Sequence, residues 1–204
     1  EIESLGLGLA TPNAGDLANA LPDDQRMVLR AIALLGGTAM ETDIAEVLLR
    51  RRAILESPLE ALCESGWLVE ESEGFYRIRV PANAAAVVEA FHPQSVRRDW
   101  GRRAASRLKY RGEYEAAGYV LSSVGDTRGA VATLSEGFRA ATHLTAYGVT
   151  LRLYRRLEEL GAAPAGVKDR VLAAIAAAAL REWQEVLRIG ASLEDSADPL
   201  TANI

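Results

Sequence analysis

The chain of 204 residues is poor in the side chains that most often carry catalysis or bind metals. It has one cysteine, Cys63, and two histidines, His92 and His143. A single cysteine excludes an intrachain disulfide and a cysteine-based zinc site, and two histidines are too few for a histidine-rich metal site. We therefore expect no metal or cofactor in this segment.

The remaining candidate catalytic residues lack partners along the sequence. Neither His92 nor His143 has a nearby nucleophile or a pair of carboxylates of the kind that acid–base chemistry requires. Cys63 follows Leu62 on the predicted inward side of a helix, which favours a buried, unreactive thiol over a nucleophile. We expect that the chain is not an enzyme.

Long apolar runs and an excess of positive charge are also missing. The longest apolar run, residues 171–180, is about half of the roughly 18–20 residues that a membrane helix needs. The first twenty residues contain no lysine or arginine, which argues against a signal peptide. The net charge of −5 is unlike that of most nucleic-acid-binding proteins. We expect a cytoplasmic protein with no membrane contact.

The first part of the chain predicts a short arm followed by three helices. Residues 1–20 show no sustained period and predict a flexible arm. The start signals of the helices are Asp23 as an N-cap, a capping box of Thr38 and Glu41, and a Ser57-Pro58 start closed by Glu60. Gly36-Gly37 and Gly66 mark helix ends.

A β-hairpin is predicted after the third helix. The β-prone stretches 67–69 and 75–80 flank an acidic turn that contains Gly74. Three short helices followed by a hairpin is the arrangement of a winged-helix domain, which we place at residues 21–80.

The rest of the chain predicts helices in pairs. The first helices of successive pairs begin near residues 95, 127 and 167, a period typical of tetratricopeptide (TPR) repeats. We predict a TPR-like helical repeat domain over residues 81–194 and a frayed tail over residues 195–204. The fold class is mainly α, a winged-helix domain followed by TPR-like α-hairpin repeats. The expected helices are 82–91, 95–111, 113–124, 127–141, 146–160, 167–180 and 182–194.

Two stretches of the sequence resemble a known family. Residues 21–79, above all LEALCESGWLVEESEGFYRIRV, look like the third helix and wing of its winged domain. Residues 102–134 are similar to its first repeat, at Gly112, Tyr114, Ala117, Gly125 and Asp126. In this order of parts the chain resembles the middle of the large ATP-binding LuxR-type bacterial transcriptional regulators, which are signalling ATPases of the STAND class.

The resemblance implies a function in signal transduction. It implies an ATPase module before residue 1, on which the winged helix packs, and repeats that sense a small-molecule inducer or a protein partner. Because the chain begins with Glu1 and not Met, we expect a segment of a longer protein or a processed product. It has neither a G-x-x-x-x-G-K-[ST] phosphate loop nor a separate terminal helix-turn-helix. We predict a regulatory and protein-interaction segment that relays effector or partner binding to neighbouring modules.

Direct DNA binding by the winged helix is the alternative. The predicted third helix presents Glu60 and Glu64 but no basic residue, and residues 1–95 carry 7 basic and 15 acidic groups. Carboxylates repel phosphates, whereas DNA-reading helices present basic or amide side chains. Only Arg50, Arg51 and Arg52 favour DNA in this region, so a structural or protein-contact role is the stronger hypothesis.

The most basic stretch of the chain is residues 96–111, with 7 basic groups and 1 acidic group. One interpretation is a solvated helix face whose long side chains cover apolar surface. The other is a contact site for DNA or an acidic partner, formed by Arg50, Arg51, Arg52, Arg97, Arg98, Arg102, Arg103 and Lys109.

Three tyrosines are candidate contacts on the surface of the repeats. Tyr110, Tyr114 and Tyr147 would line the concave side of a helical solenoid, where repeat proteins bind partners. Aromatic residues at helical spacing more often belong to the core, so this second interpretation stays open.

Overall fold

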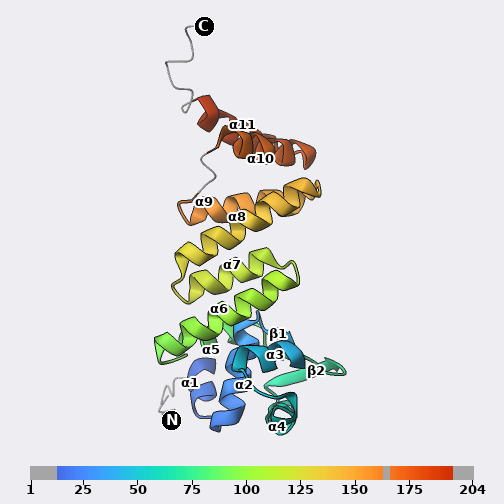
Figure 1. Ribbon diagram of the computed structural model, residues 1–204, viewed down its shortest axis with the longest axis vertical. Coiled ribbons are helices and arrows are strands. Elements are labelled where there is room, and N and C mark those ends of the chain that lie inside the picture. The colour runs from blue at the N-terminus through green and yellow to red at the C-terminus, as the bar shows by residue number, and fades with distance from the viewer. Residues whose placement is uncertain (1–12, 163–165, 195–204) are drawn as a thin grey trace, which may run out of the picture. The chain divides into compact units, whose positions relative to one another are not determined.

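The computed structural model describes residues 13–162 and 166–194, and this part of the protein is mainly α-helical. It contains eleven α-helices and one small three-stranded sheet (Figure 1). The chain divides into two compact units, residues 1–104 and 105–204. Of the helices described, none is both long enough and apolar enough to cross a membrane.

The N-terminal unit combines short helices with the sheet. Its elements are α1 (Ala14–Asn19), α2 (Asp23–Leu34), β1 (Thr38–Met40), α3 (Glu41–Leu48), a 3-10 turn η1 (Arg52–Ile54), α4 (Glu56–Glu64), β2 (Leu68–Ser72), β3 (Phe75–Ile78), α5 (Asn83–Glu89) and the first part of α6 (Gln94–Tyr110). Helix α2 lies at the centre and packs against α3, α4 and α5. The core is made of aliphatic side chains, among them Leu29, Ile32, Ile44, Leu59, Leu62 and Ile78.

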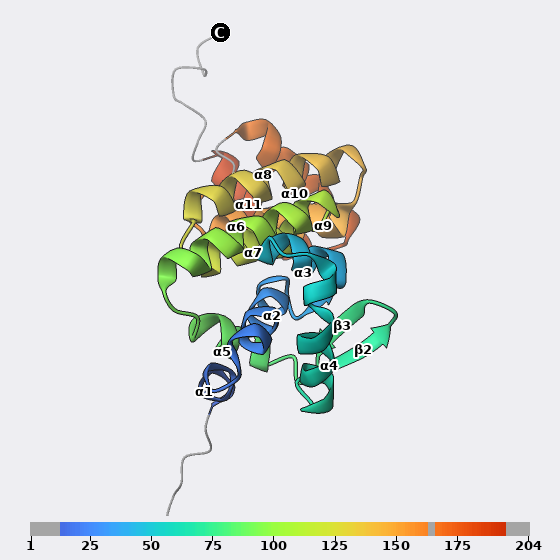
Figure 2. The same ribbon diagram turned by 60° about the horizontal axis from the view of Figure 1, so that its bottom comes forward.

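The sheet has β3 at its centre. Both neighbours run antiparallel to β3, so the strand order is β1-β3-β2. Figure 2 shows the β2–β3 hairpin beside α4. The predicted hairpin is confirmed, and its turn contains Gly74 with a φ of +71°, which an L side chain rarely adopts. The Gly74 N–H donates to the Glu70 carboxylate at 3.0 Å.

Strand β1 is absent from the sequence prediction. Thr38 belongs to this strand instead of capping a helix, and α3 begins at Glu41 without a side-chain cap. Ala39 pairs with Tyr76, which is far away along the chain. A strand of three residues has too short a pattern to be recognised, and only this long-range pairing defines it.

The start of α4 also differs from the prediction. The helix begins at Glu56, so Ser57 and Pro58 lie inside its first turn and no side chain caps it. Proline is tolerated there because the first N–H groups of a helix have no partner within the helix. For α2, Pro22 takes the N-cap position predicted for Asp23, which is the first helical residue.

Part of the predicted flexible arm is a helix. Residues 14–19 form α1, whose N-cap Asn13 accepts a hydrogen bond from the Asp16 N–H at 2.9 Å. Helix α1 packs on α5 so closely that a Cβ at Gly15 would lie 2.7 Å from the Cβ of Ala90. A helix of six residues owes its stability to such packing, which a local sequence pattern does not reveal. The rest of the predicted arm, residues 1–12, lies outside the described residues, as does the predicted frayed tail at residues 195–204.

The first helix expected in the repeats belongs to the N-terminal unit. Helix α5 packs on α1 and α2, and the Phe91 ring meets Trp100 edge-on at 5.0 Å between centroids. The Arg97 guanidinium donates to the carbonyl of Val88 at 3.2 Å. The division between the units therefore falls within α6 and not at residue 81. A composition change marks where strands stop, but it does not reveal where a helix packs.

The C-terminal unit is a stack of helices. It holds the remainder of α6 and then α7 (Tyr114–Ser123), α8 (Thr127–His143), α9 (Tyr147–Glu159), α10 (Val167–Ala179) and α11 (Trp183–Glu194). Each of the helices from α7 to α11 packs against the next one in the chain. All five helices agree with their predicted ranges to within about two residues at each end, and the described part of this unit contains no strand.

Glycines allow the helices of this unit to approach closely. A Cβ at Gly118 of α7 would lie 2.5 Å from Leu134 of α8, and one at Gly137 of α8 would overlap Tyr114 of α7. The predicted turn before α8 is confirmed, because Asp126 caps the helix by accepting from the Gly129 N–H at 3.0 Å. The core beyond this contact is formed by Leu134, Phe138, Ala141, Leu151, Leu153, Tyr154, Leu157, Ala173, Ala176, Ala177 and Ile189.

Candidate interaction surfaces

Four of the eight predicted basic contact residues bind groups within their own unit. Arg52 pairs with Glu41 at 2.9 Å, and Lys109 pairs with Glu136 at 2.6 Å. Arg103 donates to the carbonyl of Val47 and to Asp99, and Arg97 donates to the carbonyl of Val88. These four side chains stabilise the fold, as expected for arginine and lysine stems that cover apolar surface.

The other predicted basic residues face solvent. Arg50, Arg51, Arg98 and Arg102 are all exposed. Within the described chain Arg50, Arg51 and Arg98 make no hydrogen bond or ion pair through their side chains. They are the members of the predicted set whose charge remains available to a partner.

The three candidate tyrosines separate into two environments. Tyr110 is 82% exposed and Tyr147 is 39% exposed, so both can reach a partner. Tyr114 is half-buried against the core of the C-terminal unit and lies over Gly137. Its role in packing is the one that aromatic residues at helical spacing most often have.

Cys63 is the candidate catalytic residue whose surroundings the structure defines best. Cys63 is partly buried, and burial together with the Glu70 carboxylate raises the pKa of its thiol. The reactive thiolate is therefore disfavoured. No group of three or more His, Cys, Asp or Glu side chains in the described residues is placed to hold a metal ion.

The solvent side of α4 is acidic. Glu56, Glu60 and Glu64 are spaced four residues apart and all are exposed, while Leu59 and Leu62 point into the core. At this spacing the three carboxylates share one face of the helix. Such a face repels phosphates and favours contact with a basic surface.

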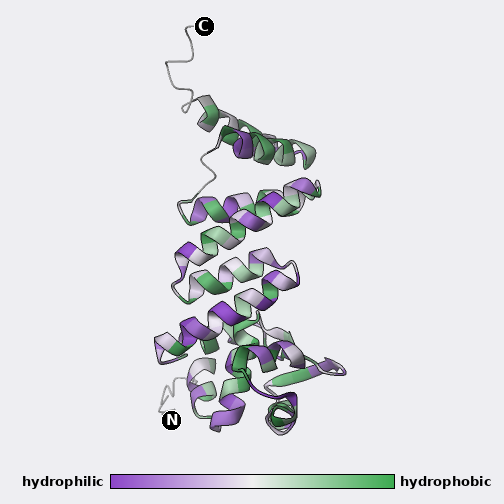
Figure 3. Cartoon of the chain, viewed as in Figure 1, coloured by the Kyte–Doolittle hydropathy of each residue, from purple (hydrophilic) through white to green (hydrophobic). Residues whose placement is uncertain are grey.

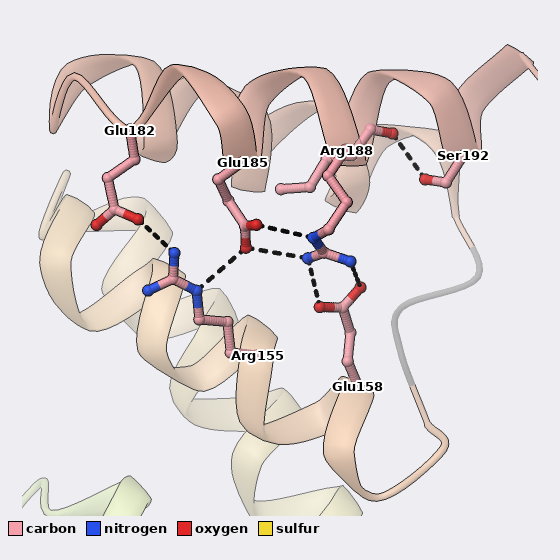
Figure 4. Close-up of polar contacts among 7 residues, drawn as sticks. Arg155, Glu158, Glu182, Glu185, Arg188 and Ser192 are labelled. Atoms are coloured by element: carbon pink, nitrogen blue, oxygen red, sulfur yellow. Dashed lines mark hydrogen bonds and ion pairs between the residues drawn. The ribbon is translucent and has the colours of Figure 1, made fainter.

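An ion-pair network joins α9 to α11 (Figure 4). Arg155 of α9 donates to Glu182, just before α11, and to Glu185 of α11, with 3.1 Å to Glu185. Arg188 of α11 donates to Glu158 of α9 at 2.6 Å and to Glu185 at 2.7 Å. Since each interhelical pair is a charge-assisted hydrogen bond, the network sets the rotation of α11 about its axis.

Glu185 is the central acid of this network. Its side chain is only 12% exposed and accepts hydrogen bonds from both Arg188 and Arg155. The guanidinium groups of Arg188 and Arg155, acting against the effect of burial, lower the pKa of Glu185 to about 2. Glu185 therefore stays ionised through the neutral and mildly acidic range and holds both arginines in place.

Two large apolar side chains in the first turns of α11 are exposed to solvent. Trp183 is 62% exposed and Leu187 is 74% exposed, and they lie four residues apart. Ile189, which points inward on the other side of the helix, is fully buried. The first turns of α11 thus bind α9 through charged residues and expose an apolar stripe on the opposite side.

Helix α10 carries a second apolar stripe. Val167, Val171 and Ile175 are spaced four residues apart and are 57%, 40% and 49% exposed. On a helical wheel they lie opposite the buried Ala173 and Ala176. We name the five side chains Val167, Val171, Ile175, Trp183 and Leu187 the outer face of α10–α11. Figure 3 shows that α10 is coloured as hydrophobic over most of its length.

Sequence reasoning missed the outer face, although a signal for it is present. Residues 171–180 contain no polar side chain, so no face of this part of α10 is suited to water. A helix that is apolar all round is normally covered on all sides. The run is about half of the roughly 18–20 residues that a membrane helix needs.

Each unit also carries an open hollow. One, of about 450 Å³, lies in the N-terminal unit and is lined by Leu17, Ala20, Leu21, Ser65, Gly66, Trp67, Val80 and Asn83. The other, of about 430 Å³, lies beside the start of α11 and is lined by Arg155, Arg181, Glu182, Trp183, Gln184 and Glu185. Both are within the size range of small-molecule sites.

Comparisons with known proteins add no assignment. No protein-family model matches the chain, and no curated protein or solved structure matches it either.

Proposed function

We propose that the chain is a regulatory, protein-interaction segment of a bacterial transcriptional regulator or signalling ATPase of the LuxR-type STAND class. Its C-terminal unit binds an effector or a partner protein, and its N-terminal unit relays that event to a neighbouring module. The mechanism is steric and allosteric, so the segment itself acts through its surfaces.

The element order of the N-terminal unit supports a winged-helix module. Helices α2, α3 and α4 precede the β2–β3 hairpin, and β1 adds to the free edge of β3. In this interpretation α4 is the third helix and the β2–β3 hairpin is the wing. Because the solvent side of α4 is acidic, the module is suited to a protein contact.

The stack of helices in the C-terminal unit supports a TPR-like array. Helices α7 to α11 pack each on its neighbour in chain order, as stacked helical hairpins do. The array provides large helix surfaces, and repeat proteins use such surfaces to bind other proteins.

The single observation that carries the proposal is the outer face of α10–α11. Five large apolar side chains, each between 40% and 74% exposed, lie on two helices that pack on each other. Apolar patches of this kind on a protein surface mark interaction sites.

A deletion in the parent protein tests the relay. Removal of residues 105–194 should change the rate of nucleotide exchange of the parent ATPase and its transcriptional output. The Leu187→Glu variant, which leaves the core intact, should reproduce the loss of the partner response. An unchanged exchange rate and output after the deletion would contradict the proposed function.

Three exposed arginines favour DNA binding as the second candidate function. Arg50, Arg51 and Arg98 are in the N-terminal unit and their guanidinium groups make no ion pair in the described residues. DNA contacts would make the affinity fall steeply with salt, because each phosphate contact releases counterions. Fluorescence anisotropy with a labelled duplex at 50 and 200 mM salt, about the range over which such losses are large, tests it. Binding that is absent or independent of salt removes this candidate.

A further inference from the structure

The side chains of the outer face of α10–α11 restrict the surface, the shape and the charge of a protein that can bind there. The proposed function requires a protein partner but does not define its chemistry. An inference about that chemistry therefore rests on the proposed function and deepens it.

The shape of the outer face suits a helix. Val167, Val171 and Ile175 on α10 and Trp183 and Leu187 on α11 form two stripes, each along its own helix axis. Gly190 lies next to the α11 stripe, and an added Cβ there would meet no heavy atom within 4 Å. Large side chains beside small ones give the ridges and hollows into which a third helix packs.

The same kind of packing already exists on the other side of α10. There the helix packs on α9 through Ala173, Ala176 and Ala177, which are fully buried. Ala178, which is half-buried, lies toward the outer side of the helix wheel, whereas Ala174 packs against the core. An incoming helix on the outer face would thus continue a helix-on-helix interface that the stack uses from α7 onwards.

The size of the outer face suits one helix better than a second copy of the whole chain. Five partly exposed side chains of this kind leave on the order of 500 Å² of apolar surface in water. A standard protein–protein interface buries about 800 Å² on each partner.

The charges at the edges of the outer face are positive. Lys168, one turn before Val171, and Arg181, in the turn between α10 and α11, are both exposed and make no side-chain ion pair in the described residues. In contrast, Glu182, just before α11, and Glu185 of α11 are neutralised by Arg155 and Arg188. A partner with carboxylates at its ends would complement Lys168 and Arg181.

We infer that the outer face of α10–α11 binds one amphipathic α-helix of a partner protein, which turns an aliphatic stripe toward Val171, Ile175 and Leu187 and places acidic side chains beside Lys168 and Arg181. This is recognition of a helix by a helical surface, with apolar anchors for affinity and charge for orientation.

Designed helical peptides test the inference with the full chain. The probe is a stapled 16-residue helix with leucines at i, i+4, i+7 and i+11 and glutamates at both ends. It should bind in the micromolar range by fluorescence anisotropy. A peptide with lysines in place of the terminal glutamates should bind at least tenfold more weakly, because it meets Lys168 and Arg181 with the same sign of charge.

Matched surface variants locate the binding. Leu187→Glu and Ile175→Glu should each weaken binding at least tenfold, since each places a charge in the apolar contact. The control is Leu144→Glu, because Leu144 is 77% exposed in the same unit but outside the outer face. This control should bind as the unchanged chain does. Circular dichroism melting curves establish that all three variants are folded.

A charge exchange tests the orientation. The double variant Lys168→Glu/Arg181→Glu should lose its preference for the acidic peptide and bind the lysine-terminated peptide at least as well. Equal binding of both peptides by the unchanged chain and by the double variant would overturn the charge assignment.

Three results would overturn the inference as a whole. They are no binding of either peptide, equal weakening by Leu187→Glu and Leu144→Glu, and a dimer in sedimentation experiments that Leu187→Glu converts to a monomer. The last result would place a second copy on the outer face.

The two proposals can fail separately. If the peptides do not bind but deletion of residues 105–194 still alters nucleotide exchange in the parent, the inference fails and the proposed function stands. If the peptides bind as expected and the deletion has no effect, the relay function fails and the helix-binding surface stands.

Discussion

Helix α4 of the N-terminal unit and helix α10 of the C-terminal unit bury one side in the same way but expose opposite chemistry. Helix α4 buries Leu59 and Leu62 and presents three exposed glutamates to solvent. Helix α10 buries three alanines and presents Val167, Val171 and Ile175 on the other side. The buried side determines how a helix packs in its unit, whereas the exposed side determines what else the unit can bind.

The largest expected effect is on the buried side of α4. Leu62 is fully buried, so Leu62→Ala should lower the free energy of unfolding by about 2–5 kcal/mol through lost burial and the cavity left behind. On α10, Ile175→Ala at the exposed side should change it by less than about 0.5 kcal/mol. Urea denaturation measures both. Similar losses of unfolding free energy in the two variants would contradict the comparison, because they would show that the side of α10 with Ile175 is packed as tightly as a core.

A second prediction concerns the effect of low pH on stability, which should differ between the ion-pair network of the C-terminal unit and the acidic face of α4. The pKa of Glu185 is about 2 in the folded protein, which is below the ordinary value of 4.5 for a glutamate. Its stabilising contribution is therefore present above about pH 4.5 and is lost as the pH falls towards 2. Glu185→Gln should destabilise the protein at pH 7 by about 1–3 kcal/mol and should make a smaller difference as the pH approaches 2.

The matched control for this acid prediction is on α4. Glu60 is exposed and makes no side-chain ion pair in the described residues, so Glu60→Gln should leave the stability at pH 7 nearly unchanged. Denaturation midpoints at several pH values test both variants. A constant difference between Glu185→Gln and the unchanged protein from pH 7 to pH 2 would refute the assigned role of the network.

A third prediction concerns the surface of α4. Replacement of Glu56, Glu60 and Glu64 by lysine should create a basic face and raise the salt-dependent affinity for duplex DNA above that of the unchanged chain. The corresponding change on α10, Val171→Lys, should not create such binding, since one charge among apolar neighbours contributes little to phosphate binding. Anisotropy titrations at about 50 mM salt distinguish the variants. Equal DNA binding before and after the change on α4 would show that its charge does not determine the partner.

The smallest expected effect is at Gly190, beside the outer face. An added Cβ there meets nothing within 4 Å, so Gly190→Ala should stabilise the protein by about 0.5–1 kcal/mol through a better helix propensity. At Gly118 the same change should destabilise it, because Leu134 occupies the space. Thermal melting shows whether each of the two variants is more or less stable than the unchanged protein. A loss of stability in Gly190→Ala would mean that the position beside the outer face is already packed.

The helices after residue 105 were predictable because their signals are local. Apolar residues recur at helical spacing, and a glycine such as Gly125 followed by the N-cap Asp126 marks a boundary. Strand β1 and helix α1 could not be predicted in the same way. Each is short, and each depends on contacts with β3 or α5 that are distant along the chain.

The candidate contact residues were also predictable only where their environment depends on local sequence. Arg98 and Arg102 are exposed on α6, in line with a solvated helix face, but the sequence could not show that Arg103 donates to the carbonyl of Val47 or that Lys109 pairs with Glu136. Charge along a sequence shows that a side chain can bind an acidic group. Only the fold shows whether an acceptor within its own unit already occupies it.

By itself the sequence determined that the chain is mainly helical, that a hairpin follows the helix ending near Gly66, and that few residues with catalytic potential are present. These properties depend on composition and on patterns within about ten residues. The tertiary structure alone decided that Arg155, Glu185 and Arg188 form a network and that Trp183 and Leu187 are exposed. The physical reason is that exposure is set by which helix covers which, and helices α9, α10 and α11 meet through side chains up to 30 positions apart.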